Sequence, residues 1–313
     1  MDRKQTRDGV VMYSVGSSYL VLTDDGQTRT CRIRGKLRTE GIRTTNPVAV
    51  GDHVAFEDAS DDKAVIKSIH PRRNCIIRRA VKLSRHAHVI AANVDQAYLV
   101  VTLINPPTST GFIDRFLATA ESHDIPVCIV FNKIDLYGKD DRALQETYRE
   151  IYASIGYECI EVSALNTQDM DRLRHRLSNR VNLFSGHSGV GKSTLINGLA
   201  PELDLRTGDT SDHYHLGRHT TTFAQMFPLS NGGYIIDTPG IKGFGIVYME
   251  KENIMNQFRE IRKRKGECKF SNCIHENEPK CAVKQGVESG EISLSRYQNY
   301  LSIYHTDDDE VYR

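Results

Sequence analysis

Residues 186–194 read Gly186-His187-Ser188-Gly189-Val190-Gly191-Lys192-Ser193-Thr194. The apolar run at 181–184, just before this stretch, has the character of a buried strand. Residues 195–199, just after it, have the character of the first turns of a helix. A strand, a glycine-rich loop and a helix in this order form a phosphate-binding loop, because the glycines let successive N–H groups face phosphate oxygens and the helix N-terminus adds partial positive charge. In such a loop Lys192 reaches the β- and γ-phosphates and the Ser193 hydroxyl coordinates Mg²⁺. The alternative, a chance Gly/Ser-rich loop, does not explain why every position and both flanks fit, so the stretch predicts a nucleotide site.

The bulk properties of the chain are those of a multidomain globular protein. Its 313 residues suffice for two or three domains, and 39% hydrophobic with 26% charged residues is an ordinary composition. The apolar runs are far shorter than the ~20 residues that span a bilayer, and the polar N-terminus lacks a signal-peptide core. Three of the seven cysteines cluster near the C-terminus, which favours a metal site in a reducing compartment over a disulfide framework. We therefore expect a cytoplasmic protein.

Residues 1–72 have the pattern of a small β-barrel. Short β-prone runs at 10–13, 19–22, 30–34, 48–56 and 64–69 alternate with turn residues, and five short strands of this kind favour an OB-fold. Such barrels bind oligonucleotides, and basic side chains suited to RNA phosphates stand at Arg29, Arg32, Arg34, Lys36, Arg38 and Arg43. A solvated basic strand face is the alternative. His70 and Pro71 break the strand pattern and indicate the end of this segment.

Residues 73–247 alternate strand-like and helix-like segments, which is the pattern of a parallel sheet with helices on its faces. Three of the apolar, strand-like runs lead into polar motifs: Asn132-Lys133-Ile134-Asp135, Ser163-Ala164-Leu165 and Asp237-Thr238-Pro239-Gly240. Each motif alone is a weak signal. Because all three follow apolar runs in a chain that also has a complete phosphate loop, we interpret them as parts of one nucleotide site.

The first two motifs are chemically suited to guanine. The Asp135 carboxylate can accept two parallel hydrogen bonds from the N1–H and N2–H₂ groups of guanine, which adenine does not offer. Asn132 can bond the other edge of the base, and the aliphatic stem of Lys133 can cover its face. Backbone N–H groups of Ser163-Ala164-Leu165 could meet O6. These roles predict guanine specificity and argue against a P-loop ATPase or kinase.

The order of the motifs identifies a family. A Ras-like GTPase runs from the phosphate loop to a switch threonine, Asp-x-x-Gly, Asn-Lys-x-Asp and then Ser-Ala, whereas Asn-Lys-Ile-Asp and Ser-Ala-Leu come first in this chain. The same sheet still forms after circular permutation, because surface termini that lie close together tolerate it. With this order, an N-terminal barrel and a C-terminal cysteine cluster, nearly the whole chain resembles the circularly permuted GTPases, specifically the bacterial ribosome small-subunit-dependent GTPase A family.

The resemblance implies a GTP hydrolase that uses GTP/GDP and Mg²⁺, binds the small (30S) ribosomal subunit and its rRNA, and assists late maturation of that subunit. It also implies slow intrinsic hydrolysis, which the subunit stimulates and which drives release. An alternative of another class is a GTP-gated RNA-binding or recruitment factor that acts on another RNA–protein particle. No heptad or exposed apolar stripe demands a dimer, so we expect a monomer, with no membrane partner.

Residues 216–222 look like the switch I of this family, a loop ordered by the γ-phosphate and Mg²⁺. One of its threonines should coordinate Mg²⁺, and Thr221 is favoured with an uncertainty of one residue. Asp237 is placed to hold the Mg²⁺ shell and the N–H of Gly240 to sense the γ-phosphate. Ile241 stands where Ras-type enzymes place a water-orienting Gln, so we interpret His219 as the candidate for that catalytic role. An exposed loop histidine is the alternative.

Residues 248–313 carry a set of metal-ligand residues on a short polar loop: Cys268, Cys273, His275 and Cys281. Three thiolates and one imidazole satisfy tetrahedral Zn²⁺ without an open position, which predicts one structural ion whose binding is tied to folding of this segment. Reduced cysteines on a loop are the alternative. Apolar residues at helical spacing in 254–261 and 294–304 predict helices around the loop, and nearby lysines and arginines could face rRNA.

Together these patterns predict an α/β P-loop GTPase core, circularly permuted, flanked by an N-terminal all-β OB-fold barrel and a C-terminal helical zinc-binding domain. The expected boundaries are 1–72, 73–247 and 248–313. Switch II leads within a few residues into the zinc segment, and the barrel enters the sheet just ahead of the base-recognition half. We therefore hypothesise that the GTP state sets the arrangement of the two flanking RNA-binding units.

Overall fold

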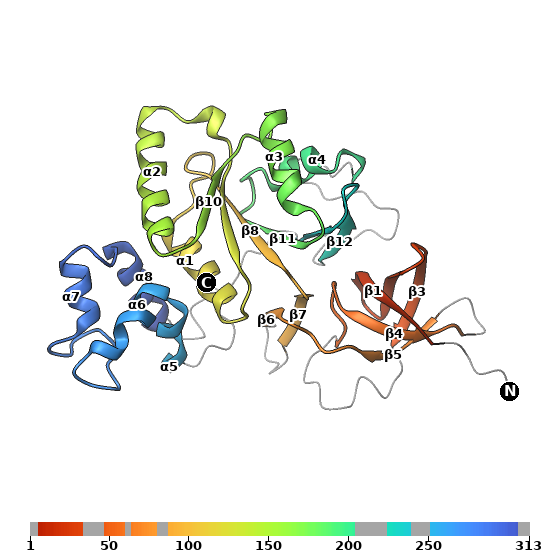
Figure 1. Cartoon of the computed structure of the whole chain (residues 1–313), viewed down its shortest axis with the longest axis horizontal. Helices are drawn as coiled ribbons and strands as arrows, with labels where there is room; N and C mark the ends of the chain where they lie inside the picture. Colours follow the sequence, from red (N-terminus) through yellow and green to blue (C-terminus); the bar gives the residue numbers. More distant parts are fainter. Residues whose placement is uncertain are drawn as a thin grey trace.

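The structure is a computed structural model that describes residues 6–33, 47–59, 64–79, 87–203, 224–238 and 251–305. Figure 1 shows an α/β core in the middle, with the N-terminal strands and the C-terminal helices on opposite sides of it. Within these ranges, the larger sheet has 11 strands in the order β10-β9-β8-β11-β13-β12-β1-β2-β3-β5-β4. Within the described part of the chain, no helix combines the length and the apolar character needed to cross a bilayer.

The N-terminal strands close into a barrel. They are β1 (Thr6–Val15), β2 (Ser18–Thr23), β3 (Thr28–Ile33), β4 (His53–Glu57) and β5 (Ala64–Ile69). β1 pairs with both β2 and β4, and β3 pairs in parallel with β5, so the order β1-β2-β3-β5-β4 returns to β1 as in an OB-fold. Alternate side chains point inward, among them the fully buried Val11, Val21 and Phe56. The predicted barrel is confirmed.

The core sheet is parallel except at one strand. Its strands are β8 (Gln96–Val101), β9 (Val127–Phe131), β10 (Glu158–Glu161), β11 (Val181–Ser185), β12 (Gln225–Pro228) and β13 (Tyr234–Asp237). Only β12 runs antiparallel to its neighbour β13 among these pairs of described strands. The central strands are continuously apolar because helices cover both faces of the sheet.

Four helices cover the core sheet. They are α1 (Thr110–Glu121), α2 (Lys139–Ser154), α3 (Thr167–Leu177) and α4 (Lys192–Leu199); two short 3₁₀ helices, η2 (Ile134–Leu136) and η3 (Pro201–Leu203), lie in the loops. Phe116 of α1 and Tyr152 of α2 pack on one face with Leu99. Leu173 of α3 packs on the other face with Val100. The predicted α/β P-loop core is confirmed.

A hairpin joins the barrel to the core. It consists of β6 (Cys75–Arg79) and β7 (Ala87–Ala92), which pair antiparallel. The sequence pattern does not predict these two strands. The hairpin forms because the barrel and the core bury it between them: Ile76 and Ala91 belong to the same hydrophobic cluster as Met12 of the barrel and Val94 of the core.

The barrel is also joined to the core through its first strand. Tyr13 of β1 pairs antiparallel with Gln225 of β12, which makes the barrel and the core parts of one sheet. The register between β1 and β2 shifts between Val11 and Tyr13. A bulge of this kind re-aims a side chain, and the Met12 side chain is buried in the core cluster with Met226 of β12.

The C-terminal helices pack against α1. They are α5 (Lys251–Ile254), η4 (Met255–Gln257), α6 (Arg259–Arg264), η5 (Lys265–Glu267), α7 (Ala282–Glu288) and α8 (Leu294–His305). Their apolar cluster includes Phe258 and Tyr300, and it also takes in Ala118 of α1. Arg259 of α6 forms an ion pair with Glu121 of α1 at 2.7 Å. The predicted helical C-terminal segment is confirmed, and it is attached to the core by apolar and ionic contacts.

Candidate nucleotide site and metal centre

The carboxyl ends of the parallel core strands bring the predicted nucleotide motifs together. β11 leads into the phosphate loop, β9 into Asn132–Asp135, β10 into Ser163-Ala164 and β13 ends at Asp237. Ligands of open α/β sheets bind outside the carboxyl ends of the strands. The topology therefore places motifs that are far apart in sequence around one edge.

The phosphate loop has the tight backbone that its glycines permit. Gly191, the residue before α4, has φ +88°, and a Cβ atom there would lie 2.5 Å from Asn132 Nδ2. A Cβ atom at Gly186 would lie 2.5 Å from the Val100 carbonyl oxygen. A side chain at Gly191 would therefore push the loop away from Asn132, and a side chain at Gly186 would push it away from β8. The Ser193 and Thr194 side chains, in the first turn of α4, are half-buried.

The cationic and acidic residues of the site meet directly. The Lys192 ammonium forms an ion pair with the Asp237 carboxylate, and both side chains are largely buried. Thr238 fixes the end of β13, because its hydroxyl donates to the Phe184 carbonyl at 3.0 Å. The arrangement brings the side chain predicted to contact phosphate next to the carboxylate predicted to hold the Mg²⁺ shell.

Asn132 connects the base-recognition loops with the phosphate loop. Its Nδ2 donates to the Val190 carbonyl at 2.8 Å, and its Oδ1 accepts from the Ala164 N–H at 3.3 Å. The residue is only 1% exposed. These bonds hold together the loop after β9, the phosphate loop and the loop at Ala164. The amide group has capacity for further hydrogen bonds, and the contact of Asn132 with the base stays a prediction.

Lys133 makes a second connection. Its ammonium donates to the carbonyl oxygens of Asn105 at 2.6 Å and Gly189 at 2.7 Å. The side chain therefore runs from the base-recognition loop to the phosphate loop, so its stem borders the space between them. Asp135 is exposed, and its carboxylate makes no hydrogen bond or ion pair with any residue that the structure describes. The predicted roles of Lys133 and Asp135 in guanine recognition stay predictions.

The Ser163-Ala164-Leu165 loop differs from the simple prediction. Its N–H groups are all used within the protein: that of Ser163 donates to Asp169 Oδ2 at 2.8 Å, and that of Leu165 to Ser163 Oγ at 3.3 Å. The Ala164 N–H has only its long bond to Asn132. The predicted contact with guanine O6 therefore requires one of the longer bonds to rearrange.

Two aromatic contacts of the site were not found from the sequence. The Tyr137 hydroxyl donates to the Asn132 carbonyl at 2.9 Å and accepts from the Leu103 N–H at 3.0 Å, which fixes the loop after β9. The Phe112 ring lies on the His187 ring, with centroids 3.6 Å apart. Burial lowers the pKa of His187 below its ordinary value, which favours a neutral ring. Neither contact has a local sequence signal, because each partner is distant in the chain.

The structure does not describe the predicted switch residues. His219, Thr221, Gly240 and Ile241 lie outside the described residues. The catalytic role of His219, the Mg²⁺ contact of Thr221 and the γ-phosphate contact of Gly240 stay predictions.

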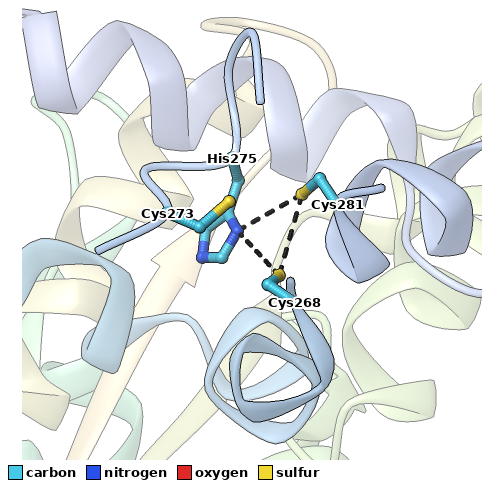
Figure 2. Close-up of side chains that lie close together, drawn as sticks. All are labelled: Cys268, Cys273, His275 and Cys281. Carbon is cyan, nitrogen blue, oxygen red and sulfur yellow. Dashed lines mark hydrogen bonds between the residues drawn. The ribbon is translucent and has the colours of Figure 1, made fainter. Parts of the chain in front are cut away.

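The predicted metal ligands form one cluster. Figure 2 shows the Cys268, Cys273 and Cys281 sulfurs gathered around the His275 ring, and the ligand atoms all lie within 4.8 Å of one another. His275 Nδ1 is 3.6 Å from Cys268 Sγ and 3.4 Å from Cys281 Sγ, and these two sulfurs are 3.9 Å apart. Zn–S bonds of about 2.3 Å and Zn–N bonds of about 2.0 Å at tetrahedral angles require separations of about 3.8 Å between sulfurs and about 3.6 Å between sulfur and nitrogen. The spacing fits zinc.

The surroundings of the cluster support a metal rather than free thiols. Glu278 holds the ligand loop, since its carboxylate accepts from the N–H groups of Ile274 at 2.7 Å and Glu276 at 2.9 Å. Burial opposes ionisation of Glu278, but these backbone bonds bring its pKa below the ordinary value. His275 itself has φ +68°, a conformation that side chains avoid unless the loop requires it.

Comparisons with known proteins agree with this geometry. The sequence model described as "RsgA GTPase" matches residues 69–247, and the "RsgA N-terminal domain" matches residues 8–66. The chain is 51% identical over 304 residues to the small ribosomal subunit biogenesis GTPase RsgA of Christiangramia forsetii, covering 96% of both chains. It is 51% identical over 311 residues to the RsgA protein of Porphyromonas gingivalis, covering 98% of this chain and 99% of the relative.

Solved structures show the same architecture. The crystal structure of YjeQ from Thermotoga maritima aligns with a TM-score of 0.77 at 34% identity, covering 96% of this chain and 98% of that one. YloQ, described as a circularly permuted GTPase, aligns with a TM-score of 0.72 at 28% identity, covering 96% of this chain and 94% of that one. The predicted resemblance and the circular permutation are thereby confirmed, and the chain belongs to the RsgA GTPase family.

Proposed function

We propose that this GTPase binds the small (30S) ribosomal subunit and its rRNA, assists late maturation of the subunit, and leaves it after subunit-stimulated hydrolysis of GTP. The observation that carries the proposal is the convergence of the phosphate loop, Asn132–Asp135 and Asp237 at one edge of the core sheet. It occurs in a chain whose relatives are named small ribosomal subunit biogenesis GTPases and align with it over nearly their full length.

In the proposed nucleotide site, each motif has one task. The N–H groups of residues 186–194 and the Lys192 ammonium bind the phosphates, so Lys192 exchanges its pairing with Asp237 for phosphate oxygens. Asp135 and Asn132 recognise guanine. Ser193 and Thr221 are the proposed ligands of Mg²⁺, which would neutralise phosphate charge when bound. His219 and Gly240 act at the γ-phosphate, His219 by orienting the attacking water.

In the proposed metal centre, Cys268, Cys273, His275 and Cys281 hold one structural zinc ion. The ligand separations and the Glu278 bonds to the ligand loop support this assignment. His275 would bind through Nδ1, since that atom faces the sulfurs. The chain then needs zinc to keep residues 268–281 folded, because the free energy of metal binding is part of the folding free energy of such a segment.

The proposed domain boundaries are 1–72, 73–247 and 248–313. Contacts on either side of the first boundary support it. Arg72 binds the barrel: its guanidinium donates to both Asp52 carboxylate oxygens at 2.7 Å. Arg73 binds the core: it forms an ion pair with Asp95 at 2.7 Å, and its N–H donates to Asn93.

RNA contacts are proposed on both flanking units. On the barrel, Arg32 of β3 is exposed and Arg29 is half-exposed, while the other predicted basic residues of this strip lie outside the described residues. On the C-terminal unit, the Lys269 ammonium lies 5.1 Å from the centroid of the partly exposed Phe270 ring, beside the metal ligands. Cations next to an exposed ring suit phosphates and unstacked bases. Because the two units lie on opposite sides of the core (Figure 1), they can reach separate parts of a large particle.

Co-sedimentation with purified ribosomal subunits tests the proposed partner. The chain is expected to sediment with small subunits in the presence of a non-hydrolysable GTP analogue and to remain in the supernatant with GDP, because the γ-phosphate orders the switch loops. Large subunits serve as the control. Equal binding to both subunits, or to neither, would contradict the proposed partner.

The alternative, a GTP-gated RNA-binding factor for another particle, predicts a different result in the same experiment. It predicts nucleotide-dependent binding to some RNA but no selective sedimentation with small subunits. The exposed basic strand β3 would then be the place to search for the RNA.

A further inference from the structure

Helix α8 holds the loop that carries the metal ligands. The Tyr297 hydroxyl donates to the His275 carbonyl at 2.6 Å, and the Tyr300 hydroxyl donates to the Ile274 carbonyl at 2.8 Å. Tyr300 is fully buried. Since both bonds go to the backbone beside a metal ligand, the position of α8 determines where His275 stands.

The same helix is bound to α1 of the GTPase core through buried charges. The Arg296 guanidinium donates to Asp114 Oδ1 at 2.8 Å and to Glu260 Oε1 at 2.7 Å, and Asn299 donates to Asp114 Oδ2 at 2.6 Å. Arg296 is 1% exposed and Asp114 is 0% exposed. Tyr152 of α2 completes the set, because its hydroxyl donates to Asp114 Oδ1 at 2.9 Å. Buried, fully bonded networks of this kind allow few alternative arrangements.

The first turn of α1 contacts the phosphate loop. The ring of Phe112, two residues before Asp114, lies against the His187 ring at an interplanar angle of 32°, with ring centroids 3.6 Å apart. The loop before the helix adds to this contact: a Cβ atom at Gly189 would lie 3.2 Å from Pro106 Cδ, and Lys133 donates to the carbonyls of both Asn105 and Gly189. Two helical residues rise by only about 3 Å, so α1 transmits displacement between Phe112 and Asp114 as a rigid unit.

We propose that Phe112, Asp114 and Asn299 are positioning residues that couple the metal centre to the phosphate loop through α1 and α8. The contacts run without a gap from His187 to Phe112, along α1 to Asp114, across to α8, and from Tyr297 and Tyr300 to the ligand loop. The proposal rests on the proposed function, since it requires guanine nucleotide at residues 186–194 and zinc at the Cys₃His cluster.

Coupling between two sites is reciprocal. A bound nucleotide holds the phosphate loop and hence His187, which restricts α1 and, through Asp114, α8. Zinc leaves only when the ligand loop opens, and opening requires the Tyr297 and Tyr300 bonds to the loop to break. Nucleotide at one end should therefore slow zinc release at the other.

Zinc release to a chromogenic chelator tests the coupling on the full chain. The release rate is measured without nucleotide and with saturating GDP. The parent chain is expected to release zinc about fivefold more slowly with GDP, which is the lower end of usual coupling. Phe112→Leu keeps an apolar side chain but loses the ring contact with His187, and Asn299→Ala loses one bond to Asp114. Both are expected to bring the ratio of the two rates close to one while zinc content stays at one ion per chain.

A matched control separates coupling from general stabilisation by the nucleotide. Phe56→Leu leaves a cavity in the separate apolar cluster of the barrel, away from α1 and the phosphate loop, so it destabilises the chain but should keep the parent's ratio. An unchanged ratio in Phe112→Leu and Asn299→Ala, or no effect of GDP in the parent, would overturn the coupling. A purified chain without zinc, or without affinity for GDP, would instead overturn the proposed function and the coupling with it.

Discussion

At the scale of single residues, Asn132 sets the geometry of the nucleotide site. Its side chain bonds the Val190 carbonyl and the Ala164 N–H, and its own carbonyl accepts from Tyr137. The bonds to Val190 and Tyr137 are buried and the bond to Ala164 is partly buried, so they restrain the loop after β9, from which Asp135 projects into solvent. The carboxylate that we propose to recognise guanine therefore stands on a well-supported loop.

Asp135→Asn should change the base preference of the chain. The substitution removes two charge-assisted hydrogen bonds, each worth about 1.5–3 kcal/mol, so GTP affinity is expected to fall by tenfold or more. Affinity for XTP should rise, because an amide N–H can donate to the C2 oxygen of xanthine. Competition against a fluorescent GDP analogue measures both affinities, and Asp140→Asn, on the exposed first turn of α2, is the control. If both affinities of Asp135→Asn matched those of the parent, Asp135 would not be the guanine-recognition residue.

The candidate residues of the two sites can be proposed from sequence where they form contiguous motifs. The phosphate loop, Asn132–Asp135 and the cysteine cluster are read locally, since the chemistry of each motif depends on its own spacing. Phe112, Tyr137 and Asp114 could not be predicted in the same way. They look like ordinary helix or loop residues, and only the fold brings them to His187, Asn132 and Arg296.

At the scale of elements, α1 is buried on two sides. Ser109 caps the helix by accepting from the Phe112 N–H at 3.2 Å. Ile113, Phe116 and Leu117 face the core sheet, as their spacing indicates, while Asp114 is turned toward α8. A buried carboxylate is stable only when it is paired, so the C-terminal helices and α1 depend on each other.

Arg296→Ala should therefore destabilise the chain strongly. It leaves Asp114 and Glu260 buried without their cation, which typically costs about 3–5 kcal/mol. Equilibrium urea unfolding, followed by circular dichroism, measures the loss. Arg149→Ala is the control, because its ion pair with Glu146 on α2 is exposed, and such pairs contribute little to stability. A loss in Arg296→Ala no larger than that of the control would mean that the buried network does not hold the C-terminal helices.

Elements were predictable where the sequence pattern is periodic and not where other parts of the chain impose the structure. The barrel strands and the core helices follow their alternation of apolar and polar residues. The hairpin β6–β7 does not, because its residues become strands only when the barrel and the core bury them.

At the scale of the whole molecule, the core carries a flanking unit on each side (Figure 1). The barrel is joined through the pairing of Tyr13 with Gln225, on the strand that follows the predicted switch I. The C-terminal helices are joined through α1, which contacts the phosphate loop. The hypothesised route through switch II lies outside the described residues, but both described joints adjoin parts of the nucleotide site. A change at the nucleotide site could therefore reach the barrel through β12 and the C-terminal helices through α1, as the hypothesis that the GTP state arranges the flanking units requires.

The three-part organisation could be predicted from sequence, whereas the placement of the parts could not. Motif order indicates a permuted GTPase core, and strand count indicates a barrel. Which faces meet depends on contacts such as Met12 with the core cluster and Arg296 with Asp114, whose partners are remote in the chain.

The rate of GTP hydrolysis with purified ribosomal subunits tests the central claim most directly. We predict slow hydrolysis by the chain alone, strong stimulation by small subunits and none by large subunits. His219→Ala should abolish the stimulated rate while leaving co-sedimentation with small subunits intact, if His219 orients the attacking water. Hydrolysis that neither subunit stimulates, or that both stimulate equally, would contradict the account of a GTPase that acts on the small subunit.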